Sequence, residues 1–147
     1  MFYFKSFKSF IIVFIQFFSV AGIIISGRKY PGEILYLAFF ILFIILGLIA
    51  IILMRNHLNI APDIKPGTVL LNKGPYRFIR HPMYTSLLGC CICYLFDEFN
   101  IMRIVLYLIL LLDILIKINY EEKILIKEFD NYADYKSKTK KLIPFIF

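Results

Sequence analysis

An uncharged run of 21 residues, Ile34–Met54, constrains the fold of this chain more than any other feature. A helix rises 1.5 Å per residue, so a run of this length crosses the roughly 30 Å hydrocarbon core of a bilayer. Hydrophobic residues make up 61% of the chain, and its mean hydropathy is +0.79. A small domain buries a lower fraction of its surface than a large one and cannot hide this much apolar surface. The sequence therefore predicts an all-α integral membrane protein and argues against a soluble or disordered chain.

Three further apolar runs extend the prediction to about four transmembrane helices. They are Ser9–Ser26, Met83–Phe96 and Ile101–Ile118. The first is longer than the apolar region of a signal peptide and has no small-residue cleavage site, so we expect it to be a retained span. The run Met83–Phe96 is short, which indicates a span in a thinned bilayer or one half of a tight helical hairpin.

The distribution of cationic residues predicts the orientation. An N-terminus in the cytoplasm leaves three of the 17 lysines and arginines outside, namely Arg28, Lys29 and Arg103. The opposite orientation reverses that ratio, so the positive-inside rule places both termini in the cytoplasm. The same distribution assigns the net charge of +7 to membrane topology and interaction with membrane lipids, and argues against nucleic acid as a partner. The sequence identifies neither the membrane nor the oligomeric state.

The connection Arg55–Pro82 is long in a chain whose other loops are short, and loops of that length are often functional. Its segment Thr68–Leu71 is expected to be extended. Pro82 fits the first turn of the following helix, where its missing N–H is not needed. It favours an extended His81, which places Arg80 and His81 beside a helix N-terminus, a position suited to binding an anion.

A second polar segment continues from the fourth apolar run. Asp113, Lys117 and Glu121 are spaced by four residues and share one face of a helix. Such charges at membrane depth must face protein or a water-filled cavity, and Asp113 fits a structural ion pair as well as a site role. Beyond them, Lys123–Lys141 alternates apolar and charged residues. It predicts a cytoplasmic amphipathic helix with Leu125, Phe129, Tyr132 and Tyr135 available for an interfacial face.

Two motifs together resemble the isoprenylcysteine carboxyl methyltransferase family, which belongs to a superfamily shared with phospholipid N-methyltransferases. The first is Gly74-Pro75-Tyr76-Arg77-x-x-Arg80-His81-Pro82-x-Tyr84, and the second is Glu121-Glu122-x-x-Leu125-x-x-x-Phe129 followed by Tyr132-x-x-Tyr135. The resemblance covers residues 55–144. It implies a single membrane methyltransferase-like domain over 1–147, with two N-terminal spans in 1–54 and a cofactor-binding core in 55–144.

The resemblance implies transfer of a methyl group from S-adenosylmethionine to a lipid-like or prenylated small-molecule acceptor at the cytoplasmic face. The cofactor pocket is then expected at the cytoplasmic end of the last helices, capped by the C-terminal segment. Carried over by motif, the cofactor-binding residues are Thr68, Val69, Leu70, Leu71, Tyr76, Arg80, His81, Pro82, Met83, Tyr84 and Glu121.

The chemistry of the reaction suits these residue types. The cofactor carries an activated sulfonium, so the protein mainly aligns the reactants. Its carboxylate suits Arg80 and its ammonium suits Glu121. Lys117 stands where relatives carry an arginine that contacts substrate, and it would place a carboxylate acceptor. An amine acceptor must lose a proton, which makes His81 or a glutamate of the pair a candidate base. We therefore take Lys117, Glu121 and His81 as candidate catalytic residues.

Other interpretations remain open at this stage. Cys90-Cys91-x-Cys93 lies on one apolar helix and is interpreted as packing, so no metal site is expected. A membrane reductase of the sterol-reductase type, with a nicotinamide cofactor, is an alternative function. A non-catalytic helical membrane protein that retains the scaffold is another, favoured by Asp130 at a position where the family usually has glycine.

Overall fold

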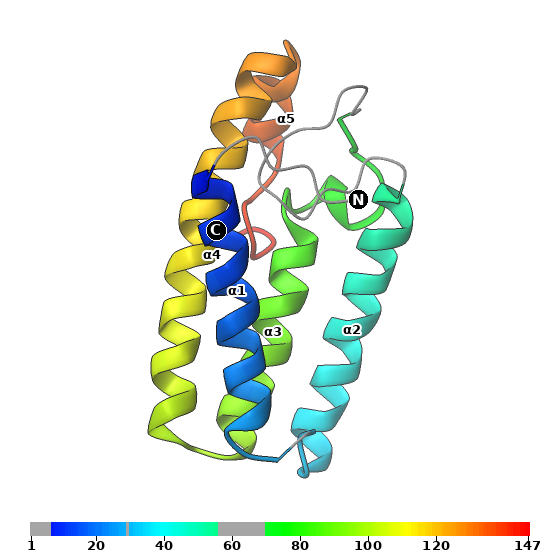
Figure 1. Ribbon diagram of the computed structural model, residues 1–147. Helices are drawn as coiled ribbons and strands as arrows, with labels where there is room; N and C mark the ends of the chain where they lie inside the picture. The colour runs from blue at the N-terminus through cyan, green and yellow to red at the C-terminus, as the bar shows by residue number, and fades with distance from the viewer. Residues whose placement is uncertain (1–6, 29, 56–69) are drawn as a thin grey trace.

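The computed structural model describes residues 7–28, 30–55 and 70–147, and this part of the chain is all-helical (Figure 1). Its elements are α1 (Phe7–Ile25), α2 (Ile34–Met54), the 3-10 helix η1 (Gly74–Arg77), α3 (Pro82–Asp97), α4 (Ile101–Glu128) and α5 (Tyr132–Lys138). Extended pairing in the described residues is limited to one isolated parallel bridge between Ile79 and Lys140.

Helices α1 and α2 are long and apolar enough to cross a membrane. Helix α2 has the bounds predicted from the sequence, and α1 begins two residues before the predicted start and ends one residue before the predicted end. Helices α3 and α4 run beside them, with α3 against α2 and α4 against α1 (Figure 1). The arrangement with four spans and both termini in the cytoplasm stays a prediction.

Local sequence determines where several elements begin. Pro82 occupies the first position of α3, as predicted. The Asn100 side chain caps α4 by accepting a hydrogen bond from the Met102 N–H at 2.9 Å. Gly74, at the start of η1, has a φ of +58°, a conformation that glycine adopts without strain.

The amphipathic helix expected over Lys123–Lys141 is divided into two pieces. Helix α4 continues beyond its apolar run to Glu128, and the short α5 begins at Tyr132 after a break. Tyr132 is 1% exposed, so it faces the protein interior rather than an interface. The amphipathic helix over Lys123–Lys141 is therefore not confirmed, because the segment is divided and Tyr132 packs inward.

Residues 139–142, which we call the C-terminal strap, lie along the beginning of α3. The backbone N–H groups of Arg80 and His81 donate to the carbonyl oxygens of Lys140 and Lys141 at 2.8 and 3.1 Å. The Thr85 hydroxyl donates to the Leu142 carbonyl at 2.7 Å. These bonds attach a segment from the end of the sequence to the Arg80-His81 motif.

The helices pack through two kinds of contact. Helix α2 approaches α3 closely because both carry glycine at the interface: a Cβ at Gly47 would collide with Ser86, and one at Gly89 with the Phe43 ring. Helix α1 packs mainly against α4. The buried apolar cluster lies among α1, α3, α4 and the strap, and it comprises Ile23, Leu88, Cys91, Tyr94, Leu106, Leu110, Ile114, Ile118 and Leu142.

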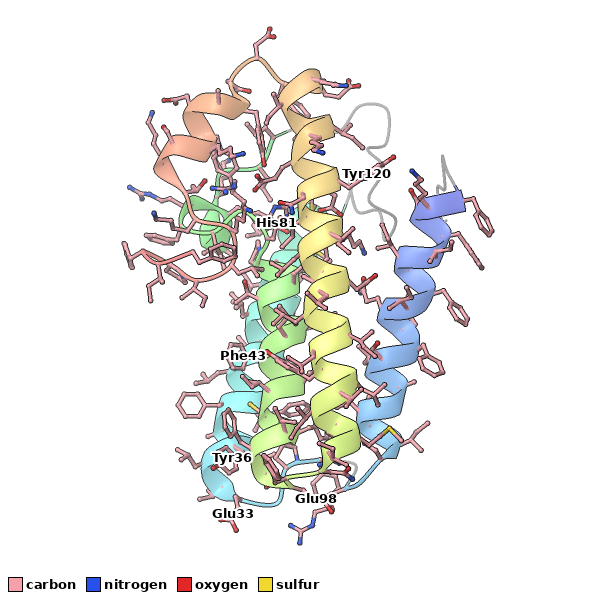
Figure 2. The ribbon with its side chains drawn as sticks, turned by 90° about the vertical axis from the view of Figure 1, so that its left-hand side faces the viewer. Glu33, Tyr36, Phe43, His81, Glu98 and Tyr120 are labelled. Carbon is pink, nitrogen blue, oxygen red and sulfur yellow. The ribbon has the colours of Figure 1, made fainter. Side chains whose placement is uncertain are left out.

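At the opposite end from His81, the connection between α1 and α2 bonds to the connection between α3 and α4 (Figure 2). Asp97 Oδ1 accepts hydrogen bonds from the N–H groups of Gly32 and Glu33, each at 2.8 Å. Arg103 is fully buried, and it donates to the carbonyls of Arg28 and Tyr94, each at 3.0 Å. These contacts fix the helix ends far from the site and leave the other end to form it.

Candidate functional site

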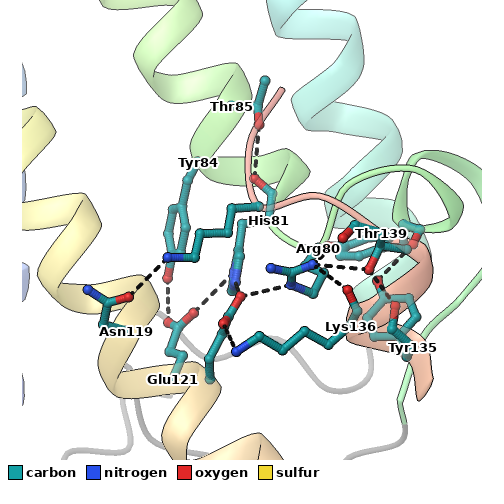
Figure 3. A network of polar contacts seen from close by, with 12 residues as sticks. Arg80, His81, Tyr84, Thr85, Asn119, Glu121, Tyr135, Lys136 and Thr139 are labelled. Carbon is teal, nitrogen blue, oxygen red and sulfur yellow. Dashed lines mark hydrogen bonds and ion pairs between the residues drawn. The ribbon is translucent and has the colours of Figure 1, made fainter. Parts of the chain in front are cut away.

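Arg80 is the centre of a polar network between α3, α4 and α5 (Figure 3). Its side chain is 6% exposed, and its Nε donates to Glu122 Oε1 at 2.8 Å. Its Nη1 donates to the carbonyl oxygens of Lys136, at 3.2 Å, and Thr139. Arg80 therefore connects the C-terminal strap and α5 to α4 through charge-assisted bonds.

Glu122 is the anionic partner of this network. Lys136 Nζ lies 3.0 Å from Glu122 Oε2, on the other carboxylate oxygen from Arg80. Burial by itself raises the pKa of Glu122, but contacts with His81, Arg80 and Lys136 outweigh it and hold that pKa well below its usual range. The carboxylate is therefore charged wherever the protein is folded near neutral pH.

Glu121 has a different environment from its neighbour in sequence. The Tyr84 hydroxyl donates to Glu121 Oε1, and His81 Nδ1 lies 3.5 Å from Glu121 Oε2. Burial raises the pKa of Glu121 above its usual value, although the charges of His81 and Lys117 partly oppose this. Glu121 is thus the carboxylate of the pair that is more ready to hold a proton.

His81 lies between the two carboxylates. Its Nε2 is 3.5 Å from Glu122 Oε1, and its ring stacks on Tyr84 with the centroids 5.6 Å apart. The residue is 7% exposed, and among the described residues Nε2 has no hydrogen-bond partner. A ring fixed by stacking beside two carboxylates can hold or move a proton at Nδ1 or Nε2.

A cleft of about 370 Å³, part of it open to solvent, adjoins the network. Its lining residues are Met54, Leu70, Leu71, Tyr76, Arg80, Leu125, Tyr132 and Tyr135. Leucine and tyrosine walls with one cation are typical of small-molecule sites, in which a few polar groups orient the ligand.

Two of the tyrosines that line this cleft, Tyr132 and Tyr135, have hydroxyls in different environments. Tyr135 donates to the Tyr76 carbonyl at 2.7 Å. The Tyr132 hydroxyl is buried and has no hydrogen-bond partner among the described residues. Burial raises the pKa of Tyr135 to about 12 and that of Tyr132 above its usual value, so both hydroxyls stay neutral. A buried hydroxyl without a partner is unfavourable by itself and can bind a polar atom of a ligand.

The residues named from the motifs fall into several groups. Leu70, Leu71, Tyr76 and Arg80 line the cleft, whereas His81, Tyr84 and Glu121 form the network beside it. Pro82 and Met83 form the first turn of α3 and are not among the lining residues. Thr68 and Val69 lie outside the described residues, and neither Leu70 nor Leu71 belongs to a strand.

Lys117 lies one helical turn before Glu121 on α4. Its Nζ donates to Gln16 Oε1 on α1 at 2.8 Å and lies 5.1 Å from the centroid of the Tyr84 ring. The residue is 1% exposed, so it is part of the interface between α1 and α4.

Sequence reasoning gave Glu122 only as a candidate base, and in the structure it is the ion-pair partner of Arg80. It assigned no site role to four residues that line the cleft, namely Met54, Leu125, Tyr132 and Tyr135. The position of Leu125 could have been predicted, because it follows Glu122 by three residues and so shares its helix face. No local pattern indicates that Tyr132 turns inward.

The comparisons with known proteins bear on this arrangement. The family model of the isoprenylcysteine carboxyl methyltransferase family matches residues 35–127, which is more than half of the chain. The match extends from α2 almost to the end of α4 and includes Arg80, His81 and both glutamates. No curated protein matches the chain.

Proposed function

Because the chain belongs to the isoprenylcysteine carboxyl methyltransferase family, whose members are membrane methyltransferases that act on lipid-like substrates, we propose that it transfers a methyl group from S-adenosylmethionine to a lipid-soluble acceptor. The observation that carries the proposal is the cleft, since four residues named from the family motif line it. The His81 and Glu121 network stands directly beside it.

The residues present suit this cofactor. The Tyr76 ring and the apolar side chains beside it suit a nucleoside, and the Tyr132 hydroxyl, which has no partner among the described residues, can bond to one of its polar atoms. Arg80 provides a cation for the carboxylate of the amino-acid end, and Glu121 an anion for its ammonium. The bound cofactor supplies the activated methyl group, and the protein supplies alignment.

The chain's own groups then determine what the acceptor can be. A carboxylate acceptor needs no base, and Lys117 would attract it into place. An amine acceptor would need His81 or Glu121 to take its proton, which the raised pKa of Glu121 would favour. The name of the family and the presence of a buried lysine both favour the carboxylate.

The proposed membrane arrangement follows from the position of the site. All four long helices would span the bilayer as one domain, with the cofactor-binding core in 55–144. The end that carries η1, α5 and the strap would face the cytoplasm, where the cationic residues gather. This arrangement would let a lipid-soluble acceptor reach the cleft from the bilayer.

A calorimetric titration tests the proposal. S-adenosylmethionine and S-adenosylhomocysteine would be titrated into the detergent-solubilised full chain and into Leu125→Trp, which fills the cleft. Ile126→Trp is the matched control, because Ile126 is the next residue of α4 and is 49% exposed. We expect micromolar binding in the wild type and in Ile126→Trp, and none in Leu125→Trp.

Failure of both ligands to bind the folded wild type would refute the proposed function. Binding of a nicotinamide dinucleotide in their place would favour the reductase alternative. Equal binding in Leu125→Trp would mean that the cofactor binds to another part of the molecule.

A further inference from the structure

Gln16 connects the first helix to the charged face of α4. It lies on α1, which precedes the part of the chain that the family model matches. Its side-chain oxygen accepts a hydrogen bond from Lys117 Nζ at 2.8 Å, between residues 101 positions apart. Val13 and Ser19, three residues to either side of Gln16, are both buried.

A buried lysine needs groups that determine where its ammonium lies. Its four-carbon stem is flexible, and its ammonium is a compact charge that loses hydration when buried. Here the Gln16 oxygen orients one N–H, and the Tyr84 ring face lies 5.1 Å away on another side. Because an amide is neutral, Gln16 orients the ammonium without cancelling its charge.

Asp113 offers a competing partner for the same ammonium. It lies one helical turn before Lys117, it is 5% exposed, and its Oδ2 has no hydrogen-bond partner among the described residues. If the Gln16 amide is removed, the ammonium is expected to turn toward Asp113 and away from Tyr84. The position of the cation therefore depends on α1.

The ammonium adjoins the polar network beside the cleft. Tyr84, whose ring it faces, donates its hydroxyl to Glu121, and Glu121 lies beside His81. On the basis of the proposed function, we infer that Gln16 is a positioning residue. It holds Lys117 where that lysine binds the anionic group of the acceptor, and it thereby determines preference for an acid over its neutral ester.

The test compares two probes that differ by one charge, N-acetyl-S-farnesylcysteine and its methyl ester. Their affinities for the full chain in detergent are measured by calorimetry, with empty micelles as the blank. We expect the wild type to bind the acid at least about tenfold more tightly than the ester, as for a hydrogen bond to a charged group. In Gln16→Leu this ratio falls to about one, with the affinity for S-adenosylhomocysteine unchanged within about twofold.

Two further variants separate positioning from a general packing effect. Gln16→Leu combined with Asp113→Asn removes the competing carboxylate, and we expect it to recover at least about threefold of the acid preference. Ser19→Ala, at another buried polar position of α1, should retain the wild-type ratio.

The outcomes distinguish this inference from the proposed function. Any one of three results overturns the role of Gln16. These are a wild-type ratio in Gln16→Leu, an equal loss of the ratio in Ser19→Ala, and no recovery of the ratio in the double variant. A wild type that binds S-adenosylhomocysteine but not the acid in preference to the ester overturns the inference alone. A wild type that binds no S-adenosylhomocysteine refutes the proposed function, and this inference with it.

Discussion

Replacement of Glu122 by glutamine tests whether the buried ion pair holds the C-terminal strap over the site. The carboxylate is 5% exposed, and it receives Arg80 Nε at 2.8 Å and Lys136 Nζ at 3.0 Å. Loss of one partner of a buried pair typically destabilises by about 3–5 kcal/mol. Glutamine keeps the shape and one acceptor oxygen, and Arg80 keeps its carbonyl partners, so we expect about 2–4 kcal/mol.

Hydrogen exchange measures this loss where it occurs. The backbone N–H groups of Arg80, His81 and Lys140 all bond across the contact between the strap and the motif. In Glu122→Gln we expect them to exchange about 30-fold to several hundred-fold faster, which corresponds to the expected free energy of local opening. The N–H groups in the middle of α3 should change far less.

The pH dependence provides a second check with a definite sign. The folded pKa of Glu122 lies below its ordinary value of 4.5. Its stabilisation is therefore complete above about pH 4.5 and is lost as the pH falls through the lower folded pKa. The protection factors of the strap, which correct for the pH dependence of intrinsic amide exchange, should be constant from neutral pH down to that value in the wild type. In Glu122→Gln this acid-induced loss should be absent.

The control is Lys136→Met, because Lys136 is 41% exposed and its contact with Glu122 is weakened by solvent. We expect a change within about 1 kcal/mol. The reasoning is refuted if Glu122→Gln leaves exchange at the strap within about threefold of the wild type, or if Lys136→Met has the larger effect.

Three further predictions concern the scaffold. Gly89→Val should lower the thermal unfolding temperature of the detergent-solubilised chain, because a Cβ there collides with the Phe43 ring; an unchanged temperature would contradict the packing of α2 on α3. Arg103→Met should destabilise by about 2–4 kcal/mol in denaturant unfolding, because a fully buried guanidinium that bonds three carbonyls is lost, and a change below about 1 kcal/mol would argue against it. Hydrogen bonds from two backbone N–H groups, above all that of Glu33, hold the pKa of Asp97 below its usual value. The stabilisation by Asp97 is therefore present above the unfolded pKa of about 3.9 and is lost as the pH falls through the folded pKa. An NMR titration of the Asp97 carboxylate would detect the lowered pKa, and an ordinary pKa would contradict these bonds.

The sequence by itself determined the helices and the composition of the site. Apolar runs of sufficient length specify α1 and α2 because backbone hydrogen bonds in a helix are local. Pro82 determined the start of α3 for the same local reason, since its ring excludes a preceding helical turn. Tyr76 and Arg80 were identified because their motif resembles that of the family, and both line the cleft.

The tertiary structure decided which of these groups meet. Helical spacing places Glu121 and Glu122 on adjacent parts of α4, but the rotation of that helix against α3 assigns Arg80 to Glu122 and Tyr84 to Glu121. The inward turn of Tyr132 depends on the same packing. Such pairings depend on contacts between residues far apart in sequence, which periodicity does not encode.

Gln16 shows the same limit most clearly. In the sequence it is one polar residue in an apolar run, and nothing nearby relates it to a lysine 101 positions away. The pairing arises because α1 lies against α4, and a buried ammonium there must bind whatever oxygen the neighbouring helix presents. The sequence determined the helices and the charges, and only their packing determined which oxygen that is.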